Sequence, residues 1–232
     1  MNSFNDAISL NNEGVSYLCS GQDKLAAECL VQALSIAKTR LSRYGDNSRD
    51  KMTPGWNQMS PSTARQYGML HTVSRLPNLL SDGYFIYNQA ISFPPSAPQD
   101  DVHALKLYSA CMILNLGLAY HRRAKMGFSR DVTLKKAEIM YEMAAQVVER
   151  DPSTMNIDCC TKAFVFTVAV NNLSQIHFEQ GKFEKAKEGV AQLSSIITRN
   201  ARVNQVLFRE DELKSLLLNV MLHGNLQLAP AA

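Results

Sequence analysis

Apolar residues recur through most of this chain at the three- and four-residue intervals of an amphipathic α-helix. In residues 205–222, for example, five apolar side chains share one helical face: Leu213, Leu216, Leu217, Val220 and Met221. The same periodicity predicts seven helices, which cover residues 5–20, 23–41, 100–126, 132–150, 154–181, 182–199 and 205–222. The last of these is apolar on one side only, as expected for a helix that caps the end of a stack.

Residues 42–99 interrupt this helical pattern. The stretch from Ser42 to Ser62 is polar and contains glycine and proline, which predicts a loop or linker. Residues 70–73 and 84–87 are rich in β-formers and predict the two strands of a short hairpin. Because this stretch exceeds the usual loop length, it is either a functional insertion or contains an element that the periodicity misses.

Three segments of the chain are similar to one another. Residues 12–33 align without a gap with residues 172–193. Residues 12–17 also align with residues 115–120, and residues 26–33 with residues 137–144, so the middle copy carries an insertion between its two halves. In each copy the aligned positions hold a small residue (Gly14, Gly117, Ser174), then a ring (Tyr17, Tyr120, His177), then an alanine (Ala26, Ala137, Ala186).

Each copy has the features of a helix–turn–helix unit. The small residue permits close approach of a neighbouring helix, and Gly21 and Gly181 stand where the first helix of copies one and three ends, a position that favours the left-handed conformation. In the second helix, the alanine and the apolar residues that follow it form a packing stripe. Such a helix pair cannot bury its apolar face alone, so the pairs are expected to stack.

This order of small residue, ring, turn glycine and alanine resembles the tetratricopeptide repeat (TPR), a helix–turn–helix unit of about 34 residues. Residues 116–120 and 172–177 are similar to its first helix, and residues 180–186 to its turn and second helix. The resemblance implies an all-α fold: a right-handed solenoid of about seven helices in stacked TPR-like pairs, with a loop or β-hairpin insertion. It further implies a single helical domain over residues 1–232 that carries an irregular insertion at residues 42–99.

Charge, cysteine content and the length of apolar runs disfavour several classes of protein. A net charge of +3, from 24 basic and 21 acidic residues, is too balanced for a dedicated nucleic-acid binder. Five cysteines without a CxxC pair argue for reduced thiols rather than a disulfide framework or zinc site. The apolar runs are too short for a membrane span, and the first residues lack a signal-peptide pattern. A cytoplasmic protein is therefore expected, with a nuclear location left open.

No catalytic motif is present. The chain contains no GxSxG, GxxxxGK[ST], GxGxxG or HExxH sequence, and its five histidines are far apart. We therefore expect a non-enzymatic protein without a cofactor or metal. An enzyme whose site lies within residues 42–99 is an alternative that no motif supports.

Asparagine occupies the same place in all three copies, as Asn12, Asn115 and Asn172. In a stacked array these positions line one concave groove, and an asparagine amide can pair with the backbone of an extended peptide whatever its side chains. In TPR proteins this position is often asparagine and faces the ligand. The sequence thus predicts a scaffold for protein–protein interaction that binds a peptide in this groove, with Asn171 and Gln175 extending the surface. The alternative is that the three amides only cap helices or link them.

A basic segment, residues 121–136, is the second candidate. Its cations include Arg122, Arg123, Lys125 and Arg130, and they suggest binding of nucleic acid or an acidic ligand. The alternative is a solvated loop whose charges are balanced by acids elsewhere. Some TPR proteins hold a C-terminal carboxylate with lysine and arginine on their first helices, but the matching positions here are not cationic. A C-terminal carboxylate is therefore not expected as the ligand. The sequence leaves the oligomeric state open.

Overall fold

The computed structural model describes residues 3–47, 71–73, 86–94, 102–127, 129–149, 158–199 and 208–224. Most of these residues are helical. The helices are α1 (Phe4–Cys19), α2 (Asp23–Asn47), α3 (Val102–Lys125), α4 (Arg130–Glu149), α5 (Asp158–Glu179), α6 (Phe183–Arg199) and α8 (Glu210–Gly224). Two short strands, β1 (His71–Val73) and β2 (Ala90–Ser92), pair antiparallel.

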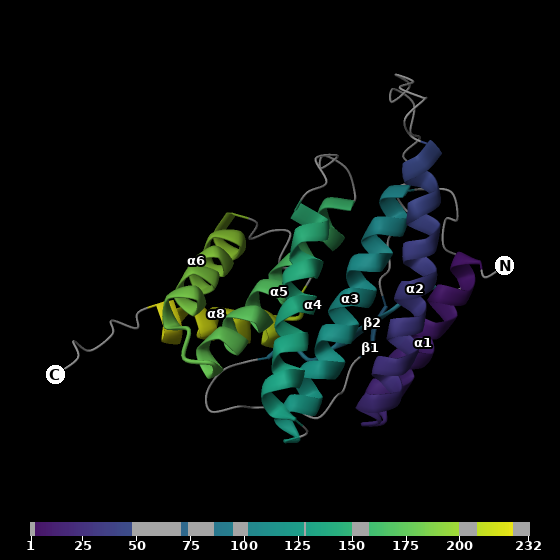
Figure 1. Ribbon diagram of the computed structural model, residues 1–232. Helices are drawn as coiled ribbons and strands as arrows, with labels where there is room; N and C mark the ends of the chain where they lie inside the picture. Colours follow the sequence, from purple (N-terminus) through teal and green to yellow (C-terminus); the bar gives the residue numbers. More distant parts are fainter. Residues whose placement is uncertain are drawn as a thin grey trace, which may run out of the picture.

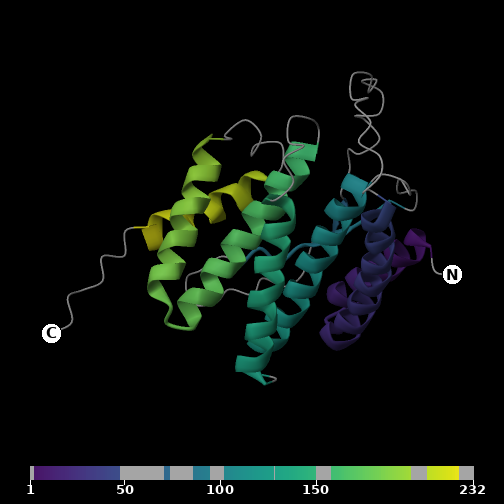
Figure 2. The same ribbon diagram turned by 45° about the horizontal axis from the view of Figure 1, so that its top comes forward.

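Each helix packs against the next one in the chain. Figures 1 and 2 show α1 to α6 standing side by side in sequence order, and α8 lying across α6 at the end of the row. Because α2, α3 and α4 alternate in direction, the end of α2, the start of α3 and the end of α4 lie at one edge of the row (Figure 1). Within the described parts of the chain, none of the helices combines the length and apolarity that crossing a bilayer requires.

The turns after α1 and α5 are built in the same way. Gly21 and Gly181 adopt positive φ angles of 75° and 70°, which a residue without a Cβ reaches most easily. The next N–H then donates back into the helix, from Gln22 to the carbonyl of Tyr17 and from Lys182 to the carbonyl of His177, each at 2.8 Å. The two aligned segments therefore fold into the same local structure.

The aligned small residues lie where the helices of the first two pairs leave no room for a larger side chain. A Cβ built on Gly14 would lie 2.9 Å from Leu30 Cγ, and one built on Gly117 would lie 2.8 Å from Tyr141 Cε1. In the third pair the roles are exchanged, because the glycine is Gly189 on α6 and it faces the Ser174 side chain on α5. Close helix approach thus recurs in α1–α2, α3–α4 and α5–α6.

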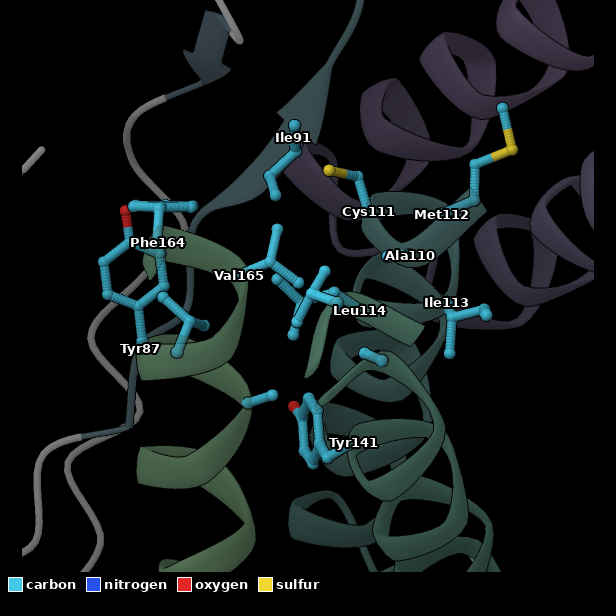
Figure 3. Close-up of a cluster of buried hydrophobic side chains, with 14 of the residues drawn as sticks. Tyr87, Ile91, Ala110, Cys111, Met112, Ile113, Leu114, Tyr141, Phe164 and Val165 are labelled. Carbon is cyan, nitrogen blue, oxygen red and sulfur yellow. The ribbon is translucent and has the colours of Figure 1, made fainter. Parts of the chain in front are cut away.

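Residues 86–94 run in an extended conformation along the face that α1, α3 and α5 form, which we call the asparagine face. The side chains of Tyr87, Ile91 and Phe93 are buried in the main hydrophobic core. In Figure 3, Ile91 points toward Val165 of α5 and lies near Cys111 of α3. This segment is therefore part of the core and not a surface loop.

The structure corrects two predictions for residues 42–99. Residues 42–47 are not a loop but the last part of α2, because no proline occurs before Pro54 and one glycine costs a helix only about 1 kcal/mol. The second strand lies at Ala90–Ser92, with Ile91 opposite Thr72. Ile86 and Tyr87 of the strand predicted at residues 84–87 are not in the sheet, and residues 84–85 lie outside the described residues. Residues 86–94 of the predicted insertion are irregular apart from β2, and their apolar side chains lie in the main hydrophobic core. Apart from residues 42–47, 71–73 and 86–94, the predicted insertion lies outside the described part of the chain.

Candidate functional site: an asparagine face with an internal strand

The three aligned asparagines hold the backbone of residues 86–94. Asn115 Oδ1 accepts from the N–H of Ile91 at 2.8 Å, and its Nδ2 donates to the carbonyl of the same residue at 2.8 Å. Asn12 makes the same pair of hydrogen bonds with Phe93, both at 2.8 Å. Asn172 makes them with Tyr87, both at 2.9 Å.

The primary amide explains why asparagine suits this position. It presents one acceptor and two donor hydrogens, so it can bind the N–H and the C=O that one residue of an extended chain directs to the same side. An aspartate would have no hydrogen to donate at neutral pH. These bonds involve only backbone atoms of the segment, and they select an extended conformation without selecting a side chain.

The segment runs opposite to the order of the helices. Its earliest bound residue, Tyr87, meets Asn172 of α5, and its latest, Phe93, meets Asn12 of α1. The other edge of the segment is paired as well, because Ala90–Ser92 forms the two-stranded sheet with β1. The backbone is therefore held along both of its edges.

Further amides position the three that touch the segment. Asn11 donates to the carbonyl of Ile91 at 3.0 Å and accepts from Asn115 Nδ2 at 2.9 Å. Asn171 donates to Asn172 Oδ1 at 3.1 Å and itself accepts from Asn219 of α8 at 2.8 Å. The fold thus connects Asn171 to Asn219, and it links the asparagine face to α8.

Gln175, which the sequence grouped with the asparagines, is buried and donates a hydrogen bond to Glu179 one turn later on α5. Its role in binding a ligand stays a prediction. Gln89 of the segment donates to Glu212 of α8, a contact that the sequence did not suggest. No local pattern marks Glu212, because its partner lies far away in the chain.

Aromatic packing adds contacts that, unlike the backbone hydrogen bonds, depend on the side chains of the segment. The Tyr87 ring packs edge-on against Phe164, with 5.5 Å between centroids, and against Phe208 at 6.1 Å. Phe93 packs against Tyr108 at 4.4 Å. Burial raises the pKa of the Tyr87 hydroxyl far above its ordinary value, so this phenol stays neutral.

Carboxylates on other helices pair with most of the cations predicted in the basic segment. Arg122 is buried and its Nε lies 2.9 Å from Asp23 Oδ1, with 3% of each side chain exposed. Burial raises the pKa of Asp23, and the Arg122 charge partly offsets that effect. Lys125 and Arg130 both pair with Glu179 of α5. Three of the four predicted cations therefore connect helices, because the fold brings distant carboxylates to them.

A group of three possible metal ligands, Glu138, Glu142 and His177, also lies close together, with ligand atoms within 4.8 Å of one another. Lys135 and Lys182 already bind the Glu138 carboxylate, at 3.0 and 2.9 Å. Burial opposes ionisation of Glu138, but the hydrogen bonds from the two lysines outweigh it and lower the pKa to about 2. With its charge compensated, Glu138 is better described as an ion-pair centre between α4 and the turn that precedes α6 than as a metal ligand.

Comparison of the chain with protein-family models, with curated proteins and with solved structures gives no match.

Proposed function

We propose that this protein is a non-enzymatic TPR-like scaffold for protein–protein interaction, whose asparagine face binds an extended peptide. The observation that carries the proposal is the repeated pair of hydrogen bonds from Asn12, Asn115 and Asn172 to backbone N–H and C=O groups. Three equivalent side chains on three successive helix pairs make the same bonds to a single extended segment. In this chain the bound segment is its own residues 86–94.

The TPR-like part of the proposal rests on local structure. The turns at Gly21 and Gly181 close with the same hydrogen bonds, and the aligned Gly14 and Gly117 lie where a Cβ would meet the second helix of the pair. In addition, each helix packs mainly on its neighbours in sequence, which is typical of repeat arrays.

The resident segment determines how an external peptide binds. Burial of Tyr87, Ile91 and Phe93 contributes about 5–9 kcal/mol at about 1.5–3 kcal/mol each. A peptide that made the same contacts would regain this energy, but it would compete with a tethered segment whose effective concentration is about millimolar. A partner peptide therefore binds below millimolar concentration only if its contacts with the asparagine face are stronger than those of residues 86–94. In this proposal the chain's own segment inhibits the scaffold.

The test is binding in trans. In the full chain, residues 86–94 are replaced by a glycine–serine stretch of equal length, and a synthetic peptide of residues 84–96 is titrated into this variant by calorimetry. We expect binding that is lost when Asn12, Asn115 and Asn172 are changed together to alanine and retained in the control Asn5→Ala, which alters an exposed residue of α1.

A peptide of the same composition with Tyr87, Ile91 and Phe93 moved to other positions should bind more weakly. If the variant without its segment is unstable, the peptide should raise its melting temperature, because a ligand stabilises the state to which it binds. No binding and no rise in melting temperature would refute the proposal.

A further inference from the structure

A hollow lies on the side of the helix row that is opposite the asparagine face. Its volume is about 680 Å³, and its walls come from α2, α3 and α4. Lys106 of α3 lines it, about two and a half helical turns before Asn115, so the hollow and the asparagine face lie on opposite sides of α3. The strand of residues 86–94 therefore does not fill it.

The hollow is apolar over most of its length. Its apolar walls are Val31, Leu34, Ala37, Leu41, Ile113, Leu116, Met140, Met143 and Val147. Between Val31 and Ser42 the α2 wall extends about 16 Å at about 1.5 Å per residue. A volume between about 300 and 1,000 Å³ with mostly apolar walls is typical of sites for small molecules.

Cations gather at one end of the hollow. Ser42 stands near the end of α2 and Lys38 about one turn before it, while Lys106 stands near the start of α3 and Gln146 near the end of α4. Because these helix ends share one edge of the row (Figure 1), the polar side chains lie at that edge and the other end of the hollow is apolar. Arg43 adds a third cation, since it lines a smaller adjoining hollow together with Lys38 and Ser42.

Within the described residues, these cations lack the acidic partners that other cations in this fold have. Among the described residues that line the two hollows, none is acidic. In the described part of the chain, Lys38, Arg43 and Lys106 form no ion pair with a carboxylate, whereas Arg122, Lys125 and Lys182 do. The site therefore offers positive charge at one end and apolar surface along the rest.

From this polarity we infer that the hollow binds a single-chain amphiphile with a carboxylate head, such as a long-chain fatty acid. The carboxylate lies between Lys38 and Lys106, and the alkyl chain extends along α2 and α4 toward Val31 and Met140. An amphipathic helix from a partner would fit less well, because its charges are spread along its length and the cations here stand at one end. This inference does not depend on the peptide-binding proposal.

The experiment is titration of the full chain with dodecanoate below its micellar concentration, followed by calorimetry. Dodecyltrimethylammonium, which has the same alkyl chain and the opposite head charge, is the matched ligand control. We expect dodecanoate to bind at one site and the cationic analogue to bind about tenfold more weakly or not at all, because the lysines repel it.

Two variants test the orientation of the ligand. Changing both Lys38 and Lys106 to glutamate should weaken dodecanoate binding by about tenfold or more, whereas Lys187→Glu on the exposed side of α6 should leave it unchanged. Met143→Trp, at a half-exposed position on the wall, narrows the hollow and should weaken binding of the alkyl chain.

Methionine-methyl NMR on the unchanged chain makes the result independent of any variant. Among the 10 methionines, the signals of Met140 and Met143 should shift most on addition of dodecanoate. The inference is overturned if dodecanoate does not bind, if both head charges bind equally, or if the shifts lie at other methionines. It is also overturned if sedimentation shows that a second copy of the chain covers the hollow.

Discussion

Replacement of Asn115 by alanine tests the structural role of the asparagine face most directly. Asn115 is 1% exposed, and its amide is the acceptor of the Ile91 N–H in the described structure. In the variant that N–H stays buried without this acceptor. The Ile91 carbonyl keeps a hydrogen-bond donor in the variant, because Asn11 still donates to it.

The magnitude follows from these bonds. A buried donor without a partner costs about 1–3 kcal/mol, and each net hydrogen bond lost costs about 0.5–1.5 kcal/mol. We therefore expect Asn115→Ala to lower the free energy of unfolding by about 2–4 kcal/mol. Asn12→Ala should cost less, about 1 kcal/mol, because Asn12 is half-buried and water can replace its amide.

The assay is urea unfolding followed by far-UV circular dichroism, with hydrogen exchange at Ile91 as a local readout. Asn115→Ala should lower the midpoint and speed exchange of the Ile91 amide, while Asn5→Ala should change neither. Asn115→Asp retains the acceptor but directs a carboxylate oxygen at the Ile91 carbonyl, so its deficit relative to the parent chain should shrink on acidification. A loss below about 1 kcal/mol for Asn115→Ala, with Ile91 exchange unchanged, would refute the argument.

Three other measurements test the core and its charges. Gly117→Ala places a methyl group 2.8 Å from Tyr141 Cε1, so thermal unfolding should show a loss of about 1–3 kcal/mol; an unchanged melting temperature would contradict the close approach. Burial lowers the pKa of His121 from 6.5 to about 4, so the unfolded chain binds more protons between these values and stability should fall as pH drops from 6.5 to 4. His121→Gln should flatten that part of the pH–stability profile, and an equally steep profile in the variant would exclude the histidine as its cause. The pKa of Glu138 is lowered from 4.5 to about 2, so its ion pairs stabilise the fold above pH 4.5 and should be lost as pH falls toward 2; Glu138→Gln should remove this dependence in acid unfolding, and an identical acid transition would refute it.

Local periodicity located the helices, although not all of their ends. The predicted ends of α1, α3, α4 and α6 agree with the structure to within two residues, because caps, turn glycines and apolar spacing act over a few neighbouring positions. The end of α2 was missed, since polar composition alone does not end a helix. The alignment also identified which asparagines share a face, because equivalent positions in stacked pairs have equivalent neighbours.

The occupant of the asparagine face was not predictable from the sequence. Residues 84–87 had the composition of a strand, but the path that carries residues 86–94 between α1 and α5 depends on contacts as distant as Asn12 with Phe93. The same reason applies to the basic segment. Arg122 is an ordinary cation in the sequence, and only its distance from Asp23 in the folded chain makes it a buried ion pair.

By itself, then, the amino-acid order determined the helices, their turns and the recurrence of one amide in three units, because each depends on interactions within a few residues. The tertiary structure alone decided what those amides bind, which charges are neutralised and where an apolar hollow with a cationic end remains open. Such properties arise between segments that are far apart in the chain, and hydrophobic periodicity contains no information about which distant segments meet.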